Sequence, residues 1–295
     1  MSKAVIVGIL IILVITISLA IYSSNPKEIR VRVTTTTSLY ATGLLEYLAD
    51  EFRKEHSNTF FDFIPVGSGE ALRRAENGDA CMVFVHAPSL EKWYIEKGVI
   101  NSRKIFAYNY FIIVGPIEDP ADIRDSKSVI NAFKKIYEAG EEGKAKFVSR
   151  GDYSGTHIKE LSVWSQADLD PHGRPWYLET GSGMANTLLV ANEEKAYALS
   201  DVGTYLKLKK EGKLSDLEIL YSNDTELINI YSVYIVSLCT GAEKQAAQEF
   251  AEFVINGGQE LIANYGTEEY GQRLFNPARD NIDWLEEVWE KLSKT

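Results

Sequence analysis

The chain opens with a long apolar segment. Residues 4–21 read AVIVGILIILVITISLAI, and only Thr16 and Ser18 interrupt these eighteen positions. As a helix the segment would be about 27 Å long, close to the hydrocarbon thickness of a bilayer, and it has none of the polar stripe that marks a helix packed on a soluble core. The pattern predicts a signal-anchor helix or a cleavable signal peptide over residues 1–22, with the remainder of the chain exported.

The residues do not decide between a signal-anchor helix and a cleavable signal peptide. A cut after Ala20 would satisfy the small-residue rule of signal peptidase, whereas the length of the apolar run favours an uncleaved anchor. Lys27, Arg30 and Arg32 follow the segment and argue against export on charge alone. The expectation of export therefore rests on the binding chemistry described below.

Beyond a polar linker at residues 23–28, the apolar positions switch between the period of a strand and the period of a helix. Strand-like runs occupy residues 29–33, 60–66, 81–85, 106–114, 146–149 and 228–238. Helix-like runs occupy residues 44–52, 71–75, 129–138, 158–164, 186–194, 246–265 and 284–292. This alternation predicts α/β layers around a parallel or mixed sheet.

Charge and cysteine content exclude several classes of protein. Lys and Arg number 31 against 42 Asp and Glu, a net charge of −11, which argues against a nucleic-acid-binding surface. Cys81 and Cys239 are too few for a disulfide scaffold, and a single bridge between them is left open. No two of the four histidines fall three or four residues apart, so no metal site is expected.

Residues suited to binding an anion gather where predicted strands pass into predicted helices. Unpaired N–H groups and the helix dipole favour an anion at such a point, while Ser and Thr add hydroxyl donors and Gly allows close approach. A Ser or Thr at one junction would ordinarily be no more than a helix cap. The junctions of this kind are residues 34–38, 67–69, 149–156 and 181–183.

The third junction carries the most specific signal. It reads Arg-x-x-x-Ser-Gly-Thr from Arg150 to Thr156, which supplies a fixed cation, two hydroxyls and a glycine, and Asp152 could orient the guanidinium. The alternative reading is an enzyme in which Ser154 is activated by His157. A third residue to orient that histidine is not identifiable, so we predict no catalytic residues.

Short blocks in a fixed order resemble the substrate-binding proteins of ABC-type tungstate uptake systems, a class of two-lobed periplasmic-type anion receptors. The resemblance covers about residues 31–265. Cys81, Ala185 and Val202 depart from the residues usual in that family, and none of the three is a residue to which the family assigns a contact. The blocks are TTTS at 35–38, VGSGEAL at 66–72, VHAP at 85–88, SRGD at 149–152 and SGTH at 154–157.

The resemblance implies a two-lobed periplasmic-binding-protein-like fold (type II) of α/β class, with the ligand cleft between the lobes. Lobe 1 would comprise residues 29–115 and 228–295, and lobe 2 residues 116–227. The strand-like runs at 106–114 and 228–238 would cross between them. The anion-binding residues carried over from the family are Thr37, Ser38, Ser68, Arg150, Ser154, Gly155 and Thr156.

The same resemblance implies the function and the partners. The expected ligand is tungstate, with molybdate, sulfate and phosphate as alternatives because all are tetrahedral oxyanions. The expected partners are an ABC permease with its ATPase subunit and, through the N-terminal helix, the outer face of the cytoplasmic membrane. A secreted or periplasmic form is expected if the signal is cleaved. A monomer without cofactor or nucleic-acid partner is expected.

Overall fold

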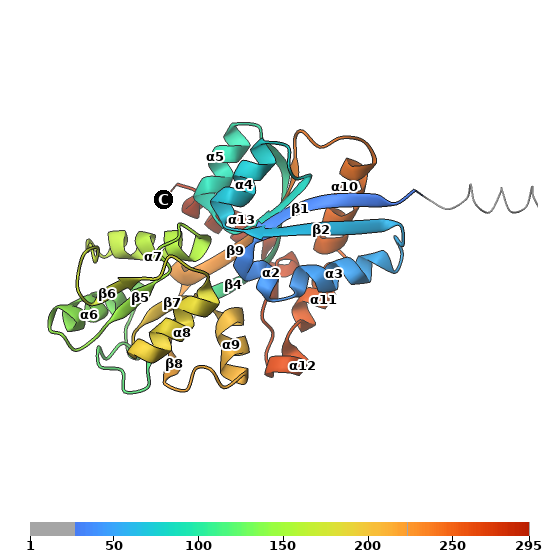
Figure 1. The fold of residues 1–295 in the computed structure, drawn as a ribbon. Helices are drawn as coiled ribbons and strands as arrows, with labels where there is room; N and C mark the ends of the chain where they lie inside the picture. Colours follow the sequence, from blue (N-terminus) through green and yellow to red (C-terminus); the bar gives the residue numbers. More distant parts are fainter. Residues whose placement is uncertain (1–26, 223, 295) are drawn as a thin grey trace, which may run out of the picture.

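The computed structural model describes residues 27–222 and 224–294 (Figure 1). The elements are β1 (Ile29–Thr36), α2 (Thr37–Ala41), α3 (Leu44–Arg53), β2 (Thr59–Val66), α4 (Ser68–Glu76), β3 (Met82–Val85), α5 (Pro88–Glu96), β4 (Ile100–Pro116), α6 (Val129–Glu141), β5 (Phe147–Ser149), α7 (Gly155–Gln166), β6 (Tyr177–Glu179), α8 (Met184–Glu194), β7 (Ala198–Asp201), α9 (Val202–Lys210), β8 (Leu217–Tyr221), β9 (Ile228–Val236), α10 (Gly241–Ile255), α11 (Gly258–Asn264), α12 (Thr267–Tyr270), β10 (Asn276–Pro277) and α13 (Ile282–Leu292).

One half of the molecule is built on a mixed sheet with the strand order β10-β4-β9-β3-β1-β2. Strands β2, β1 and β3 run parallel, whereas β9 is antiparallel to both β3 and β4. We call this sheet, with α2–α5 and α10–α13, the large half; it lies at the upper right in Figure 1. Its largest core cluster joins Val31 and Val33 of β1 to Leu48 of α3 and Phe250 of α10, so residues from both ends of the chain bury one another.

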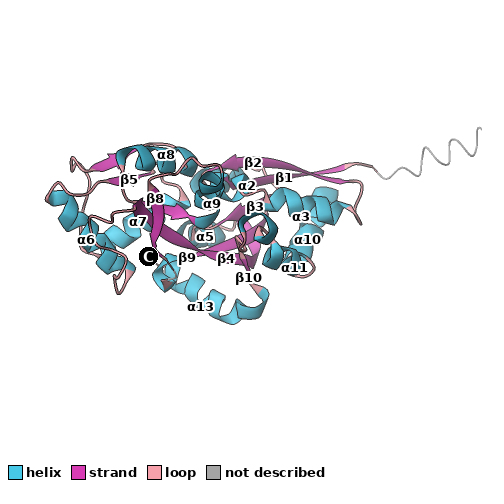
Figure 2. Cartoon of the chain, turned by 90° about the horizontal axis from the view of Figure 1, so that it is seen from below, coloured by secondary structure: helices cyan, strands magenta, loops and turns pink. Residues whose placement is uncertain are grey.

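Strand β4 continues from the large half into the second one. Its first part pairs with β9, and its last residues, from Phe111 onward, pair with β7 and β8. We call β5–β8 with α6–α9 the small half, which lies at the lower left in Figure 1 and apart from α3 and α10 in both views (Figures 1 and 2). Side chains alternate along this part of β4, so Phe111 and Ile113 enter one core cluster with α6 and α7, and Ile112 and Val114 enter another with α8 and α9.

The hydrophobic pattern located most elements, and its misses have physical causes. Strands β6, β7 and β8, with 3, 4 and 5 residues, were not predicted, because so short a strand shows little period; β3 and β5, which are as short, were predicted. Helices α5 and α9 were also not predicted. The predicted helix over residues 246–265 is two helices, α10 and α11, because the chain leaves the helical conformation at Asn256 (φ −113°, ψ −94°). The lobe boundaries at residues 116 and 228 stay predictions.

The signal or anchor segment predicted over residues 1–22 lies outside the described residues. Across residues 27–222 and 224–294, none of the helices is both long enough and apolar enough to cross a bilayer.

A disulfide bond joins Cys81 to Cys239, a pairing that the sequence left open. The bond connects the start of β3 with the segment after β9, and 158 residues separate the two cysteines along the chain. Within the described residues the two sulfurs and a Glu243 oxygen lie close enough to share a metal ion, but the disulfide uses both thiols. The cross-link therefore ties two strands of the large half's sheet.

Candidate anion-binding site

The carboxyl ends of three parallel strands bring predicted residues of the large half to one edge. Thr36 at the end of β1 is paired with Val66 at the end of β2, and Thr35 with Phe84 of β3. The residues that follow each strand therefore lie at the same edge, where ligands of open α/β sheets bind. These residues are Thr37 and Ser38 after β1, Ser68 after β2, and His86 after β3.

The small half presents a corresponding edge. Strands β5 and β6 run parallel, with Ser149 opposite Glu179, and Arg150 follows β5 directly. Arg150 is 3% exposed, and its Nη2 donates to Asp152 Oδ2 at 2.6 Å, the orienting contact that the sequence suggested. Burial disfavours the charge on Asp152, but hydrogen bonds from Ser154 and the Arg150 charge outweigh it and hold the Asp152 pKa below its ordinary value.

The two edges meet at His86 and Gly155. His86 Nε2 lies 3.3 Å from Ser38 Oγ, and a Cβ built on Gly155 would lie 2.7 Å from His86 Cε1. The positive charge of Arg150 also acts on the His86 imidazole. The structure thus brings Ser38 of the large half together with Gly155 and Arg150 of the small half.

Three of the predicted residues carry buried polar atoms without a protein partner. Within the part of the chain that the structure describes, Ser68 Oγ, Arg150 Nε and Thr156 Oγ1 are buried and make no hydrogen bond. Leaving such a group unpaired costs about 1–3 kcal/mol, and more for a charged one, so in native proteins it is usually satisfied by a bound water or a ligand. All three atoms can donate a hydrogen bond, which is the property required of groups that hold an anion.

Helix N-termini add further donors at both edges. Helix α4 begins at Ser68 after Gly67, which has no side chain to cap the first turn, and α7 begins at Gly155. The free N–H groups and the dipole of each helix favour negative charge at these points. The donor set therefore combines one guanidinium with hydroxyls and backbone amides.

Two predicted residues have a different setting from the others. Thr37 is exposed as the first residue of α2. Ser154 is buried, and its Oγ accepts the His157 backbone N–H at 3.4 Å as the cap of α7. A Ser hydroxyl that accepts a capping bond can still donate its own hydrogen, so the predicted role of Ser154 stays open.

The Ser154–His157 pair does not have the geometry of an activated nucleophile. His157 Nδ1 accepts the backbone N–H of Tyr153 at 2.9 Å. The contact between Ser154 Oγ and His157 runs through the His157 backbone N–H. The imidazole is therefore engaged by the loop that precedes α7.

The buried carboxyl group of Glu160 is linked by hydrogen bonds to the loop that carries Arg150. Glu160 of α7 is 2% exposed and accepts from Ser149 Oγ at 2.8 Å and from Tyr177 OH at 2.6 Å. Ser149 Oγ in turn accepts the Gly151 N–H at 3.2 Å, so Glu160 is linked to the residue that follows Arg150. Burial raises the pKa of Glu160 to about 7.

Replacing Glu160 with glutamine is expected to change how stability depends on pH. Because the folded pKa of about 7 exceeds the ordinary 4.5, the folded state holds this proton more tightly than the unfolded chain. The resulting stability is present below pH 4.5 and is lost as pH rises through 7, a change on the order of 3 kcal/mol. Urea unfolding at pH 5 and pH 8 should show a larger loss in the wild type than in Glu160→Gln. Equal losses in the two proteins would contradict the assignment.

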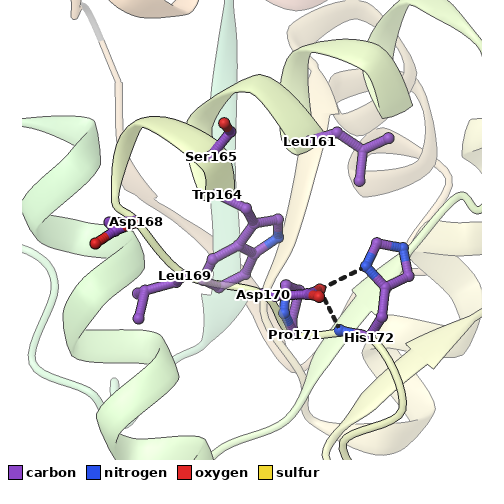
Figure 3. Close-up of a pocket in the computed structure, with 8 residues that line it drawn as sticks. All are labelled: Leu161, Trp164, Ser165, Asp168, Leu169, Asp170, Pro171 and His172. Carbon is purple, nitrogen blue, oxygen red and sulfur yellow. Dashed lines mark hydrogen bonds and ion pairs between the residues drawn. The ribbon is translucent and has the colours of Figure 1, made fainter.

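Two cavities flank α7. One of about 680 Å³ lies between the halves and has His86, Gly155 and Lys159 among its lining residues. The other, of about 440 Å³, lies at the end of α7, where Asp170 accepts from the ring and the backbone of His172 (Figure 3). The lining of this second cavity includes none of the predicted anion-binding residues.

Sequence reasoning did not assign His86 or Asp201 to the site. Asp201 ends β7, is buried, and accepts at both carboxylate oxygens from Thr204. Burial raises the pKa of Asp201, and the positive charge of Arg150 offsets part of this rise. The Asp201 carboxyl therefore lies within electrostatic reach of the Arg150 guanidinium. For His86 the available signal was a polar residue directly after a predicted strand. For Asp201 no such signal existed, because β7 was not predicted.

Known proteins resemble this chain in sequence and in fold. A family model described as a PBP superfamily domain matches residues 22–257. The tungstate-binding protein TupA of Peptoclostridium acidaminophilum is 38% identical, over 82% of this chain and 84% of that protein. The solved tungstate-binding protein TupA of Desulfovibrio alaskensis is 36% identical, covers 84% of this chain and 98% of its own, and gives a TM-score of 0.72. The solved structure of the tungstate ABC transporter from Geobacter sulfurreducens is 39% identical, covers 81% of this chain and 100% of its own, and gives a TM-score of 0.71. The chain therefore belongs to the PBP superfamily and, within it, to the tungstate-binding proteins of ABC transport systems.

Proposed function

We propose that this protein captures tungstate between its two halves outside the cytoplasm and delivers it to an ABC permease. The observation that carries the proposal is the set of unpaired buried donors at Ser68, Arg150 and Thr156, contributed by both halves. The proposed site comprises these three residues with Thr37, Ser38, Ser154 and Gly155.

Closure of the halves supplies the affinity in this account. An oxyanion held by one edge attracts the donors of the other, and the exclusion of water strengthens each contact. About six to eight charge-assisted hydrogen bonds of roughly 1.5–3 kcal/mol each would cover the roughly 12 kcal/mol of a nanomolar site after the costs of association. The net charge of −11 is compatible with this, because the donors act locally.

The location and the partners belong to the same proposal. The apolar residues 4–21 would act as an anchor, or as a signal that is removed, and the Cys81–Cys239 disulfide suits an oxidising compartment. The protein would act as a monomer that meets the permease and its ATPase subunit at the outer face of the membrane. The engagement of His157 by Tyr153 favours this receptor over an enzyme on the same scaffold.

Titration calorimetry with four anions tests the proposal. We expect tungstate to bind most tightly, in the nanomolar range, with molybdate next, and sulfate and phosphate much weaker. All four ions are tetrahedral, so the comparison separates size and charge from shape. Binding of phosphate alone would contradict the proposal, because a protonated oxyanion needs a carboxylate acceptor, and Asp152 is already engaged by Arg150.

A further inference from the structure

His86 occupies the contact between the two halves. It follows β3 directly and is 5% exposed. The next residue is fixed by its backbone, since the Ala87 N–H donates to Glu91 Oε1 at 2.6 Å. The imidazole packs against Tyr231 of β9 with 5.0 Å between ring centroids. Contacts within the large half are therefore enough to hold the ring in place.

The ring makes two contacts that concern the anion site. Its Nε2 lies 3.3 Å from Ser38 Oγ, within the large half. On its other side it meets Gly155, where an added Cβ would lie 2.7 Å from Cε1 and 2.9 Å from Nδ1. Cβ atoms do not approach a ring this closely, so the observed closeness of the halves requires glycine at position 155.

The hydrogen-bonding capacity of His86 fits a role in orienting Ser38. Burial lowers the pKa of His86 to about 4, so the imidazole is neutral near pH 7 and has one N–H donor. When Nε2 carries that hydrogen and donates it to Ser38 Oγ, the Ser38 hydroxyl hydrogen can point at an anion or at Thr36 Oγ1, which lies 3.5 Å from Ser38 Oγ. Nδ1 is then the acceptor nitrogen. Among the described residues it is buried and makes no hydrogen bond, although the Asn229 side chain lies near enough to the imidazole to raise its pKa against the effect of burial.

We propose that His86 is a positioning residue of the anion site, which orients the Ser38 hydroxyl and provides the surface on which Gly155 closes. This inference rests on the proposed function. It adds a residue from the third parallel strand and explains why position 155 carries no side chain.

A double-mutant cycle on tungstate affinity tests the closure contact. Gly155→Ala is expected to weaken tungstate binding at least about 30-fold, because the added methyl group strikes the His86 ring when the halves close. In the His86→Ala background the same substitution should cost less than about threefold, because the two ring atoms nearest the added Cβ are removed and the next nearest atom is the His86 carbonyl oxygen at 3.3 Å. Thermal unfolding of all four proteins reports whether each is folded.

His86→Phe separates the two roles. It keeps a ring against Gly155 and removes the nitrogen at Ser38, so it should weaken binding about tenfold and retain the Gly155→Ala penalty. Equal Gly155→Ala penalties in the wild-type and His86→Ala backgrounds would overturn the inference while the wild type still binds tungstate. A wild type that fails to bind tungstate would instead overturn the proposed function.

Discussion

Replacing Arg150 with alanine is expected to cause a large loss of tungstate affinity. Arg150 is 3% exposed and is the cation that the candidate site places beside its hydroxyl and amide donors. Removing one partner of a buried, hydrogen-bonded charge pair costs about 2–5 kcal/mol or more, which is roughly a 30- to 4,000-fold loss of affinity. Calorimetry measures the loss, and circular dichroism reports whether the fold is retained.

Two variants make this result specific. Arg150→Lys keeps the charge but loses the planar fork and should bind with intermediate affinity. Arg174→Ala removes an exposed arginine that pairs with Glu141, and should leave the affinity unchanged. Undiminished binding by a folded Arg150→Ala protein would show that the site has been assigned wrongly.

Removing the disulfide is expected to produce the largest loss of stability. The Cys81–Cys239 bond spans 158 residues, and a cross-link over so long a segment restricts the unfolded chain strongly. We expect Cys81→Ser with Cys239→Ser to lower the free energy of unfolding by about 2–5 kcal/mol. Guanidinium unfolding with and without dithiothreitol measures the effect.

The reductant provides the internal control for this prediction. It should destabilise the wild type to about the level of the double variant and leave the double variant unchanged. Tungstate affinity should be retained in the double variant, because Cys81 lies before β3 and His86 after it, at opposite ends of the strand. Two free thiols titrated in the unreduced wild type would show that the bond does not form.

The sequence could predict the features that depend on neighbouring residues, and not those that depend on contacts between distant parts of the chain. The junctions after β1, β2 and β5 were predicted, because hydroxyl, glycine and arginine residues follow clear strand patterns there. Ser68, Arg150 and Thr156 each carry a buried donor atom without a partner. This could not be predicted from the sequence, because residues distant in the chain determine which atoms are buried and which are paired. Tertiary pairing also defines β4, which begins at Ile100, six residues before the apolar run that was predicted.

His86 shows the limit most clearly. In the sequence it is a single histidine after a short buried strand, and most such residues satisfy a local hydrogen bond. Its proximity to Gly155 links positions 69 residues apart, and that spacing carries no period or motif. Conversely, the resemblance to tungstate-binding proteins located residues of both halves, because the short blocks that carry it coincide with the strand ends.

A crystal structure of the protein soaked with sodium tungstate would show directly where the anion binds, because tungsten scatters anomalously and its position is unambiguous. We expect a single strong peak enclosed by Ser38 and Ser68 of the large half and Arg150 and Thr156 of the small half. A tungsten peak at another place, with the hydroxyls of Ser68 and Thr156 still unpaired, would contradict this placement.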